Sequence, residues 1–133
     1  PLAKIPGIAV EHVERLAAVG IKQTRQLFGR AWSRSGRSEL VKETGIPEDV
    51  MLELVKLSDL ARAGYVGPIY ARMLYETGED TLEKLAQSSP AELHAKLLAV
   101  NEEQKLTRVT NFTGKDIASA VEIAQMLPKV VEY

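Results

Sequence analysis

Four arginines in the first third of this sequence could bind an anionic partner: Arg25, Arg30, Arg34 and Arg37. Residues 22–42 hold six basic side chains and one acidic one, whereas the whole chain of 133 residues has a net charge of −1. Spacings of four and three residues would place the last three arginines on one face of a continuous helix. Such a face could bind nucleic-acid phosphates or an acidic protein surface, or it could be a solvated face neutralised by nearby glutamates.

Glycine-bearing turns offer a second kind of anion site, made of backbone rather than side chains. Glycine adopts positive φ and lets the backbone approach a phosphate, and the free N–H groups that begin the next helix can then bind it. The candidate positions in these turns are Gly7, Ile8, Gly45, Val66 and Gly67. This chemistry is weakened by Ala9, Tyr65 and Pro47, which replace a glycine or remove an N–H. Acidic residues also follow two of the turns and would repel phosphate.

Trp32 is the single tryptophan of a chain in which aromatic residues make up only 5%. It lies four residues after Phe28, so a helix would place both side chains on one face. Packing in the core is the interpretation we favour. The alternative is that Trp32 anchors an interface, as tryptophan often does.

The sequence does not indicate the chemistry of an enzyme or a metal centre. Without cysteine, the chain has no thiolate ligand or nucleophile. Its two histidines, His12 and His94, have no second ligand at metal-binding spacing, and a glycine-rich phosphate loop with its lysine is absent. We therefore expect a non-enzymatic protein without catalytic residues, metal, cofactor or small-molecule substrate.

The composition argues against a membrane-spanning protein and favours helices. No apolar run approaches the roughly 20 residues that cross a bilayer, and we expect that residues 1–7 do not belong to a signal peptide, because no apolar stretch follows their charge. Hydrophobic residues make up 45% of the chain but few are aromatic, so aliphatic side chains must form the core, which suits packed helices. The lack of disulfides fits a reducing compartment. We expect a cytoplasmic protein that does not bind membranes.

Apolar residues recur every three or four positions, and glycine, proline and capping residues mark the ends of the predicted helices. We expect helices to end at Gly20, Gly45 and Gly78. We expect helices to begin at caps formed by Thr24, Ser38, Thr81 and the capping box Ser89-Pro90-Ala91-Glu92. The pair Ser35-Gly36 is expected to break the helix that carries Trp32.

Towards the C-terminus, the sequence predicts a loop, a helix and an extended tail. Residues 101–111 are polar and indicate a loop. A helix is expected from about residue 113 until Pro128 stops it. Residues 129–133 follow as a short extended tail. We expect this tail to pack on the chain's own core rather than to pair as a strand with another chain.

The same order of turns and helices occurs twice. The strings Leu2-Ala3-Lys4 and Leu60-Ala61-Arg62 each precede a glycine-bearing turn, a helix and a second glycine. A duplicated pattern of this length is more specific than any single glycine. It predicts two repeats, residues 1–59 and 60–133, packed as one compact unit.

The turns resemble the helix-hairpin-helix motif, in Ile5-Pro6-Gly7-Ile8-Ala9 with Gly20-Ile21 and again in Tyr65-Val66-Gly67-Pro68 with Gly78. Across nearly the whole chain, the order of elements resembles a bacterial family classed as a domain of unknown function, which is similar to tandem helix-hairpin-helix proteins. The strings that carry this resemblance are Ser58-Asp59-Leu60, Val66-Gly67-Pro68-Ile69-Tyr70-Ala71, Leu93-His94-Ala95-Lys96-Leu97 and Val100-Asn101. The resemblance implies an all-α fold, a duplicated helix-hairpin-helix-like (SAM-domain-like) bundle of about eight short helices with a short extended C-terminal tail.

Two functions are compatible with these features. The one we favour is a protein-interaction or assembly module on a helix-hairpin-helix scaffold, with another protein as partner, because the phosphate-binding chemistry of the turns is weakened. The alternative is weak, sequence-independent binding of DNA or RNA through the hairpin backbone amides and the basic cluster from Arg25 to Arg37.

Overall fold

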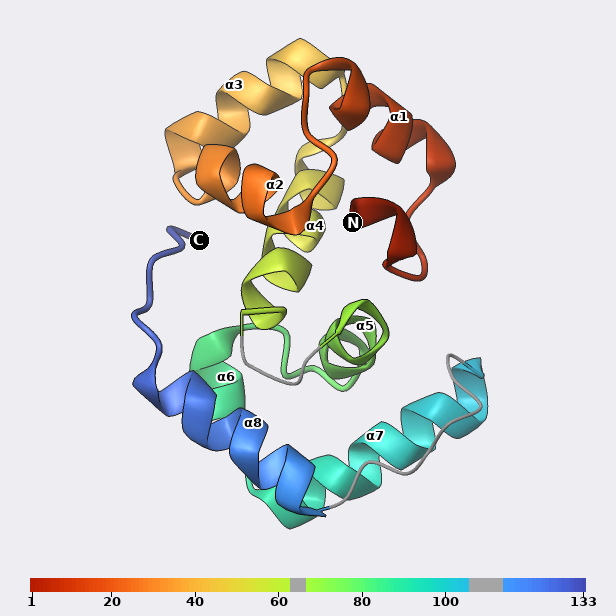
Figure 1. Cartoon of the computed structure of the whole chain (residues 1–133), viewed down its shortest axis with the longest axis vertical. Coiled ribbons are helices and arrows are strands. Elements are labelled where there is room, and N and C mark those ends of the chain that lie inside the picture. Colours follow the sequence, from red (N-terminus) through yellow and green to blue (C-terminus); the bar gives the residue numbers. More distant parts are fainter. Residues whose placement is uncertain (63–66, 106–113) are drawn as a thin grey trace.

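The computed structural model of the chain describes residues 1–62, 67–105 and 114–133. Within them the chain forms eight α-helices, one short 3-10 helix and no strand, which confirms the expected all-α fold (Figure 1). The elements are η1 (Leu2–Lys4), α1 (Val10–Ala18), α2 (Thr24–Ala31), α3 (Arg34–Thr44), α4 (Glu48–Leu60), α5 (Pro68–Glu76), α6 (Leu82–Ala86), α7 (Pro90–Gln104) and α8 (Gly114–Met126). None of these helices is long and apolar enough to cross a membrane.

Helix α4 connects two groups of helices. It packs against α2 and α3, which precede it, and against α5, which follows it. In the second group, α6 and α7 pack on α8, and α5 contacts both α7 and η1. Figure 1 shows α1–α3 at one end of the molecule and α6–α8 at the other, with α4 and α5 between them.

A hydrophobic core runs through both groups and depends strongly on α4. Met51, Leu54, Val55, Leu57 and Leu60 of this helix are at most 1% exposed. Full burial of such a side chain stabilises the fold by about 1.5–3 kcal/mol relative to leaving it in water. The last turn of α4 therefore has a fixed position, and the polar side chains that it carries are buried with it.

The predicted helix ends at three glycines are confirmed. Gly20, Gly45 and Gly78 have φ angles of +84°, +71° and +95°, a conformation that costs glycine little. The predicted cap at Thr81 is also confirmed, since its hydroxyl accepts a hydrogen bond of 3.2 Å from the backbone N–H of Lys84.

The predicted break at Ser35-Gly36 is wrong, because both residues lie inside α3. The helix is capped earlier, where the hydroxyl of Ser33 accepts a hydrogen bond of 3.0 Å from the backbone N–H of Gly36. This bond satisfies one of the N–H groups that a helix start leaves without a partner. Ser38, the predicted cap, is therefore an interior residue of α3.

Two other helix starts and one loop also differ from expectation. Thr24 is the first residue of α2, and the cap is formed instead by Gln23 and Gln26, whose side chains bond reciprocally to the backbone. Ser89 is the N-cap of α7, as expected, but its side chain makes no capping hydrogen bond. Residues 101–104 belong to α7, in whose last turn Asn101 is buried, and residues 106–111 of the predicted loop lie outside the described part of the chain.

Residues 129–133, called the tail below, have no regular secondary structure. The tail leaves α8 after Leu127-Pro128 and runs towards α2 and α3 (Figure 1). The backbone N–H of Glu132 donates a hydrogen bond of 2.8 Å to the carbonyl oxygen of Trp32. Val131 packs partly buried against the core. As expected, the tail lies on the chain's own helices.

Candidate functional site

The start of α3 places two of the predicted arginines side by side. Because Ser33 caps the helix, Arg34 is its first residue and Arg37 lies one turn later on the same face. Arg30 belongs to α2 and pairs with Glu43, with 2.7 Å between the charged atoms. The expected single face with three arginines is therefore wrong. Arg34 and Arg37 are called the arginine pair below.

The arginine pair binds the backbone of the tail. Arg37 donates through Nη2 to the carbonyl oxygen of Glu132, and Arg34 donates through Nε to the carbonyl oxygen of Tyr133. Through Nη1, Arg37 also donates to two carbonyl oxygens at the end of α2, at 3.0 and 3.2 Å. A cation is favourable there because the C-terminal end of a helix is partly negative. Arg37 thus ties the end of α2 to the tail.

Glu132 is held by its side chain as well as by its backbone. Its Oε1 accepts a hydrogen bond of 3.1 Å from the backbone N–H of Arg34, at the start of α3. The N-terminal end of a helix favours negative charge, so this carboxylate stabilises the helix end. Burial and, secondly, the charge of Arg34 lower the pKa of Arg37, and the attraction of Glu132 opposes this shift.

The side chain of Tyr133 reaches the last turn of α4. Its hydroxyl donates a hydrogen bond of 3.2 Å to Oδ2 of Asp59, and Nζ of Lys56 lies 5.8 Å from the ring centroid. Asp59 is 2% exposed, and its Oδ1 accepts a hydrogen bond of 2.8 Å from Nε of Arg62. Burial raises the pKa of Asp59 above 3.8, and the contacts with Arg62 and Tyr133 oppose this only in part.

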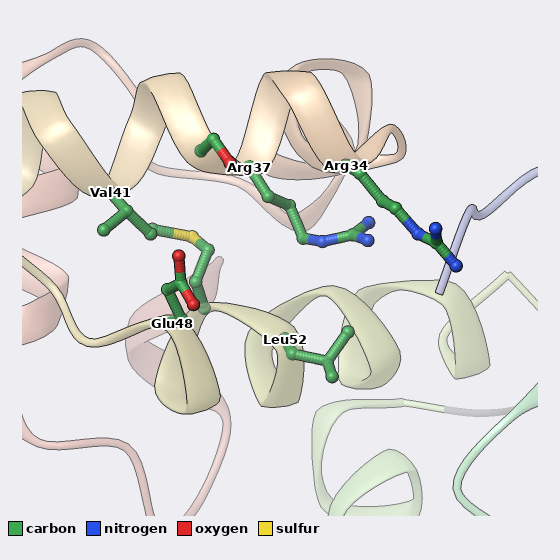
Figure 2. Close-up of a pocket in the computed structure, with 7 residues that line it drawn as sticks. Arg34, Arg37, Val41, Glu48 and Leu52 are labelled. Atoms are coloured by element: carbon green, nitrogen blue, oxygen red, sulfur yellow. The ribbon is translucent and has the colours of Figure 1, made fainter.

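A pocket of about 240 Å³ opens between α3 and α4, next to the arginine pair. Figure 2 shows the side chains of the pair extending from α3 along this pocket, with the tail passing near Arg34 and with Glu48, the first residue of α4, at the far end from Arg34. The lining residues are Arg34, Arg37, Ser38, Val41, Glu48, Met51 and Leu52. Apolar side chains thus lie directly beside two cations.

The turn at Gly7 is occupied by an arginine that the sequence analysis did not single out. Arg72 of α5 is 4% exposed and donates through Nε to the carbonyl oxygen of Pro6 at 2.6 Å. Its Nη1 pairs with Glu53 at 2.6 Å and with Glu76 at 3.2 Å. These carboxylates disfavour a phosphate at this turn. The sequence did contain one sign of this ion pair: Arg72 and Glu76 are four residues apart on a largely apolar helix, a spacing that places both on one face.

The structure does not bring the other turn candidates together. Gly45 ends α3, and its carbonyl oxygen accepts a hydrogen bond of 3.4 Å from Arg15. Gly67 is the N-cap of α5, and Val66 lies outside the described residues. Ile8 is half-buried beside the first turn. The described candidates therefore lie at separate turns.

Trp32 and Arg25 are both at the surface. Trp32 is 40% exposed, so the expected packing of its side chain in the core is wrong. Arg25 lines a different pocket, where the guanidinium of Arg62 lies 4.6 Å from the ring centroid of Phe28. Within the described ranges, no group of three or more potential ligands could hold a metal ion.

These features define a class: an all-α domain whose tail is docked on the ends of its own helices. The chain belongs to the family described as Domain of unknown function (DUF4332), whose model matches residues 6–127. No curated protein and no solved structure matches the chain. The matched residues include the arginine pair and end before the tail.

Proposed function

We propose that this domain is a non-enzymatic protein-interaction module that binds an extended protein segment carrying glutamate followed by tyrosine. The observation that carries the proposal is the docked tail, in which Glu132 and Tyr133 occupy a surface made by Trp32, the arginine pair and Asp59. This surface is called the docking surface below. A partner segment with the same two residues would make the same bonds there.

Most bonds at the docking surface contact the backbone of the bound segment. The arginine pair donates to two successive carbonyl oxygens, and Trp32 accepts from an N–H. Main-chain bonds of this kind give affinity for an extended segment, and side-chain sites give specificity. Specificity comes here from the start of α3, which binds a carboxylate, and from Asp59, which accepts from a hydroxyl. The pocket beside the arginine pair offers room for an apolar side chain of the same segment.

The same contacts support a protein partner over nucleic acid. Phosphate binding needs cations that are free to approach the nucleic-acid backbone. The arginine pair holds the tail, Arg30 pairs with Glu43, and Arg72 is buried against two glutamates. The carboxylate of Asp59 within the docking surface would also repel phosphate. Weak binding of DNA or RNA is the alternative outcome of the experiment below.

We also propose that the scaffold is a duplicated helix-hairpin-helix with repeats at residues 1–59 and 60–133. One support is the pair of glycines that follow α1 and α5, Gly20 and Gly78, since each has positive φ and lies three residues before the N-cap of the next helix. A second support is the packing order. Helices α2 and α3 pack on α4 in the way that α6 and α7 pack on α8.

Peptide binding to a chain with a loosened tail tests the proposed function. In the full chain, Glu132→Ala with Tyr133→Ala removes the side-chain bonds of the tail and should free the docking surface. A fluorescent peptide with the sequence of residues 128–133 should bind this variant more tightly than the unchanged chain. The reason is that the chain's own tail competes at an effective concentration on the order of millimolar. Adding Arg34→Ala and Arg37→Ala should weaken the binding about tenfold or more, since two hydrogen bonds are lost and a typical bond contributes about 0.5–1.5 kcal/mol.

Arg30→Ala is the matched control, because it removes an exposed arginine that pairs with Glu43 instead of the tail. It should leave peptide binding unchanged. An equal loss with Arg30→Ala, or binding that does not depend on the arginine pair, would contradict the proposal. A duplex DNA probe tests the alternative function, which is weak binding of nucleic acid. Binding of DNA that falls steeply from low to moderate salt, with no binding of the peptide, would favour nucleic acid.

A further inference from the structure

The tail crosses from one group of helices to the other. Its covalent neighbour α8 packs on α6 and α7, whereas Glu132 and Tyr133 bind at α2, α3 and α4. Between these places, the carbonyl oxygen of Pro128 accepts a hydrogen bond of 3.0 Å from Arg62. The bonds of the tail with Arg34 join residues 98 and 99 positions apart. Their geometry therefore does not depend on the local course of the chain.

We infer that the docking surface also receives the tail of a second copy of this chain, so that two copies exchange tails. The inference rests on the proposed function of the docking surface. An exchanged tail makes the same bonds with Trp32, the arginine pair and Asp59 as the chain's own tail. Exchange of an identical segment is a low-cost route to dimers, because only the connecting residues change course. Here those residues are 127–131, and each copy completes the docking surface of the other.

Exposed apolar side chains near the tail favour a second copy as the partner. Met126 at the end of α8 is 76% exposed, Val130 in the tail is 38% exposed, and Trp32 at the docking surface is 40% exposed. Tail exchange brings the end of α8 in one copy towards the docking surface of the other, where such side chains cover one another. The net charge of −1 adds little repulsion between two copies.

Protein concentration decides between the closed and the exchanged form. In the closed form the tail is tethered beside its site, which gives an effective concentration on the order of millimolar. A second copy competes only when its own concentration approaches that value. The closed monomer therefore dominates in dilute solution, and the exchanged dimer forms in concentrated solution.

Cysteines introduced at the two ends of one backbone hydrogen bond report the exchange directly, because the chain has no cysteine of its own. The N–H of Glu132 lies 2.8 Å from the carbonyl oxygen of Trp32, which places the two residues within the roughly 7 Å that a disulfide spans between Cα atoms. Chains with Trp32→Cys are mixed with isotope-labelled chains carrying Glu132→Cys at about 1 mM, the expected effective concentration, and are mildly oxidised. Mass spectrometry should show a several-fold excess of labelled–unlabelled dimers over like–like dimers. Arg34→Ala with Arg37→Ala in the Trp32→Cys chain should remove this excess.

A single chain carrying both Trp32→Cys and Glu132→Cys distinguishes the two proposals. In dilute solution it should form a disulfide within the chain, because its own tail is docked. If it does so and the mixed chains give no excess of mixed dimers, tail exchange is wrong and the docking surface stands. If no disulfide forms within the chain, docking itself is wrong and the proposed function fails with it. Light scattering should also show dimers of the unchanged chain in concentrated solution, and monomers alone would overturn the exchange.

Discussion

Arg72 and the arginine pair both hold backbone carbonyl oxygens, and they differ in burial. Arg72 is 4% exposed and joins Pro6 in the first turn to the carboxylates of Glu53 and Glu76. The arginine pair at the start of α3 is more accessible to solvent and holds the tail. Both places make the same kind of hydrogen bond to a carbonyl oxygen, but Arg72 is also enclosed between two carboxylates, so its surroundings differ in burial and in charge.

Burial, rather than the hydrogen bond itself, separates a permanent contact from one that can open. Removing one member of a buried ion pair costs about 3–5 kcal/mol, because the remaining charge is left without compensation. A typical hydrogen bond to a carbonyl oxygen contributes only about 0.5–1.5 kcal/mol. The ring centroid of Tyr75 lies 5.4 Å from the guanidinium of Arg72, which adds to its enclosure. Nη2 of Arg72 is buried without a hydrogen-bond partner among the described residues. Arg72 therefore fixes the first turn, whereas the arginine pair can release the tail.

Replacing Arg72 should have the largest effect on stability. Arg72→Leu removes the bond to Pro6 and leaves Glu53 and Glu76 uncompensated. We expect the free energy of unfolding to fall by about 3 kcal/mol, at the lower end for a buried pair because both glutamates are partly exposed. Arg34→Ala with Arg37→Ala should lower it less, by about 1–2 kcal/mol, since these bonds to carbonyl oxygens lie nearer the solvent. Urea unfolding followed by circular dichroism measures both free energies. Equal losses in the two variants would show that burial does not distinguish Arg72 from the arginine pair.

Alanine at Gly7 should be more harmful than alanine at Gly20. The two glycines have nearly equal φ angles, +83° and +84°, so the backbone penalty of about 1–2 kcal/mol is shared. A Cβ at Gly7 would lie 3.1 Å from Nε of Arg72, whereas one at Gly20 would have no atom of the described residues within 4 Å apart from its chain neighbours. We expect Gly7→Ala to cost about 1 kcal/mol more, in the range for overpacking a filled site.

The same urea measurements in an Arg72→Leu background make this prediction sharper. There the extra cost of Gly7→Ala over Gly20→Ala should shrink, since the crowded guanidinium is absent. An undiminished difference would show that Arg72 is not the cause.

The smallest expected effect concerns the pH dependence of the tail site. Burial raises the pKa of Asp59 above its unfolded value of 3.8. The stability that the protonated carboxyl contributes is therefore fully present below pH 3.8 and is lost as the pH rises through the folded pKa. An asparagine side chain does not titrate, so Asp59→Asn should gain stability relative to the unchanged chain as the pH is raised from about 4 to 7. Unfolding at a series of pH values measures this difference.

Asp80→Asn is the control of opposite sign. Burial alone would raise the pKa of Asp80, but hydrogen bonds from Lys56 at 2.8 Å and Lys84 at 2.9 Å lower it overall. The stability that ionised Asp80 contributes is present above pH 3.8 and is lost as the pH falls through the folded pKa. Asp80→Asn should therefore lose stability relative to the unchanged chain as the pH rises. If both variants gained stability, or both lost it, relative to the unchanged chain as the pH rises, the opposite pKa shifts of Asp59 and Asp80 would be refuted.

Much of the fold could be predicted from the sequence, because helix ends depend on neighbouring residues. Gly20, Gly45 and Gly78 end helices as expected, since positive φ suits glycine. The predicted start of α3 was wrong because more than one serine in this stretch could cap the helix. Ser33 and Ser38 are both possible caps. Ser33 caps a longer helix that packs on both α2 and α4, and tertiary packing of this kind overrides local preference.

The candidate site could be predicted only in part. The arginine pair was visible as part of a basic stretch, and the tail was expected to pack on the chain itself. The sequence did not indicate that the arginine pair and the tail form one site, because Arg34 and Glu132 are 98 positions apart. Asp59 was also missed, although an acidic residue beside the apolar Leu60 was a signal that it could be buried with a partner.

By itself, the sequence determined the all-α class, most helix ends and the basic stretch, since each depends on residues within a few positions of one another. Only the tertiary structure decided what each arginine holds. Arg72 meets Pro6 across 66 positions, and the arginine pair meets the tail across nearly 100. The physical reason is that charge is a property of the residue, whereas burial and the choice of partner depend on how α4 and α5 bring distant segments together.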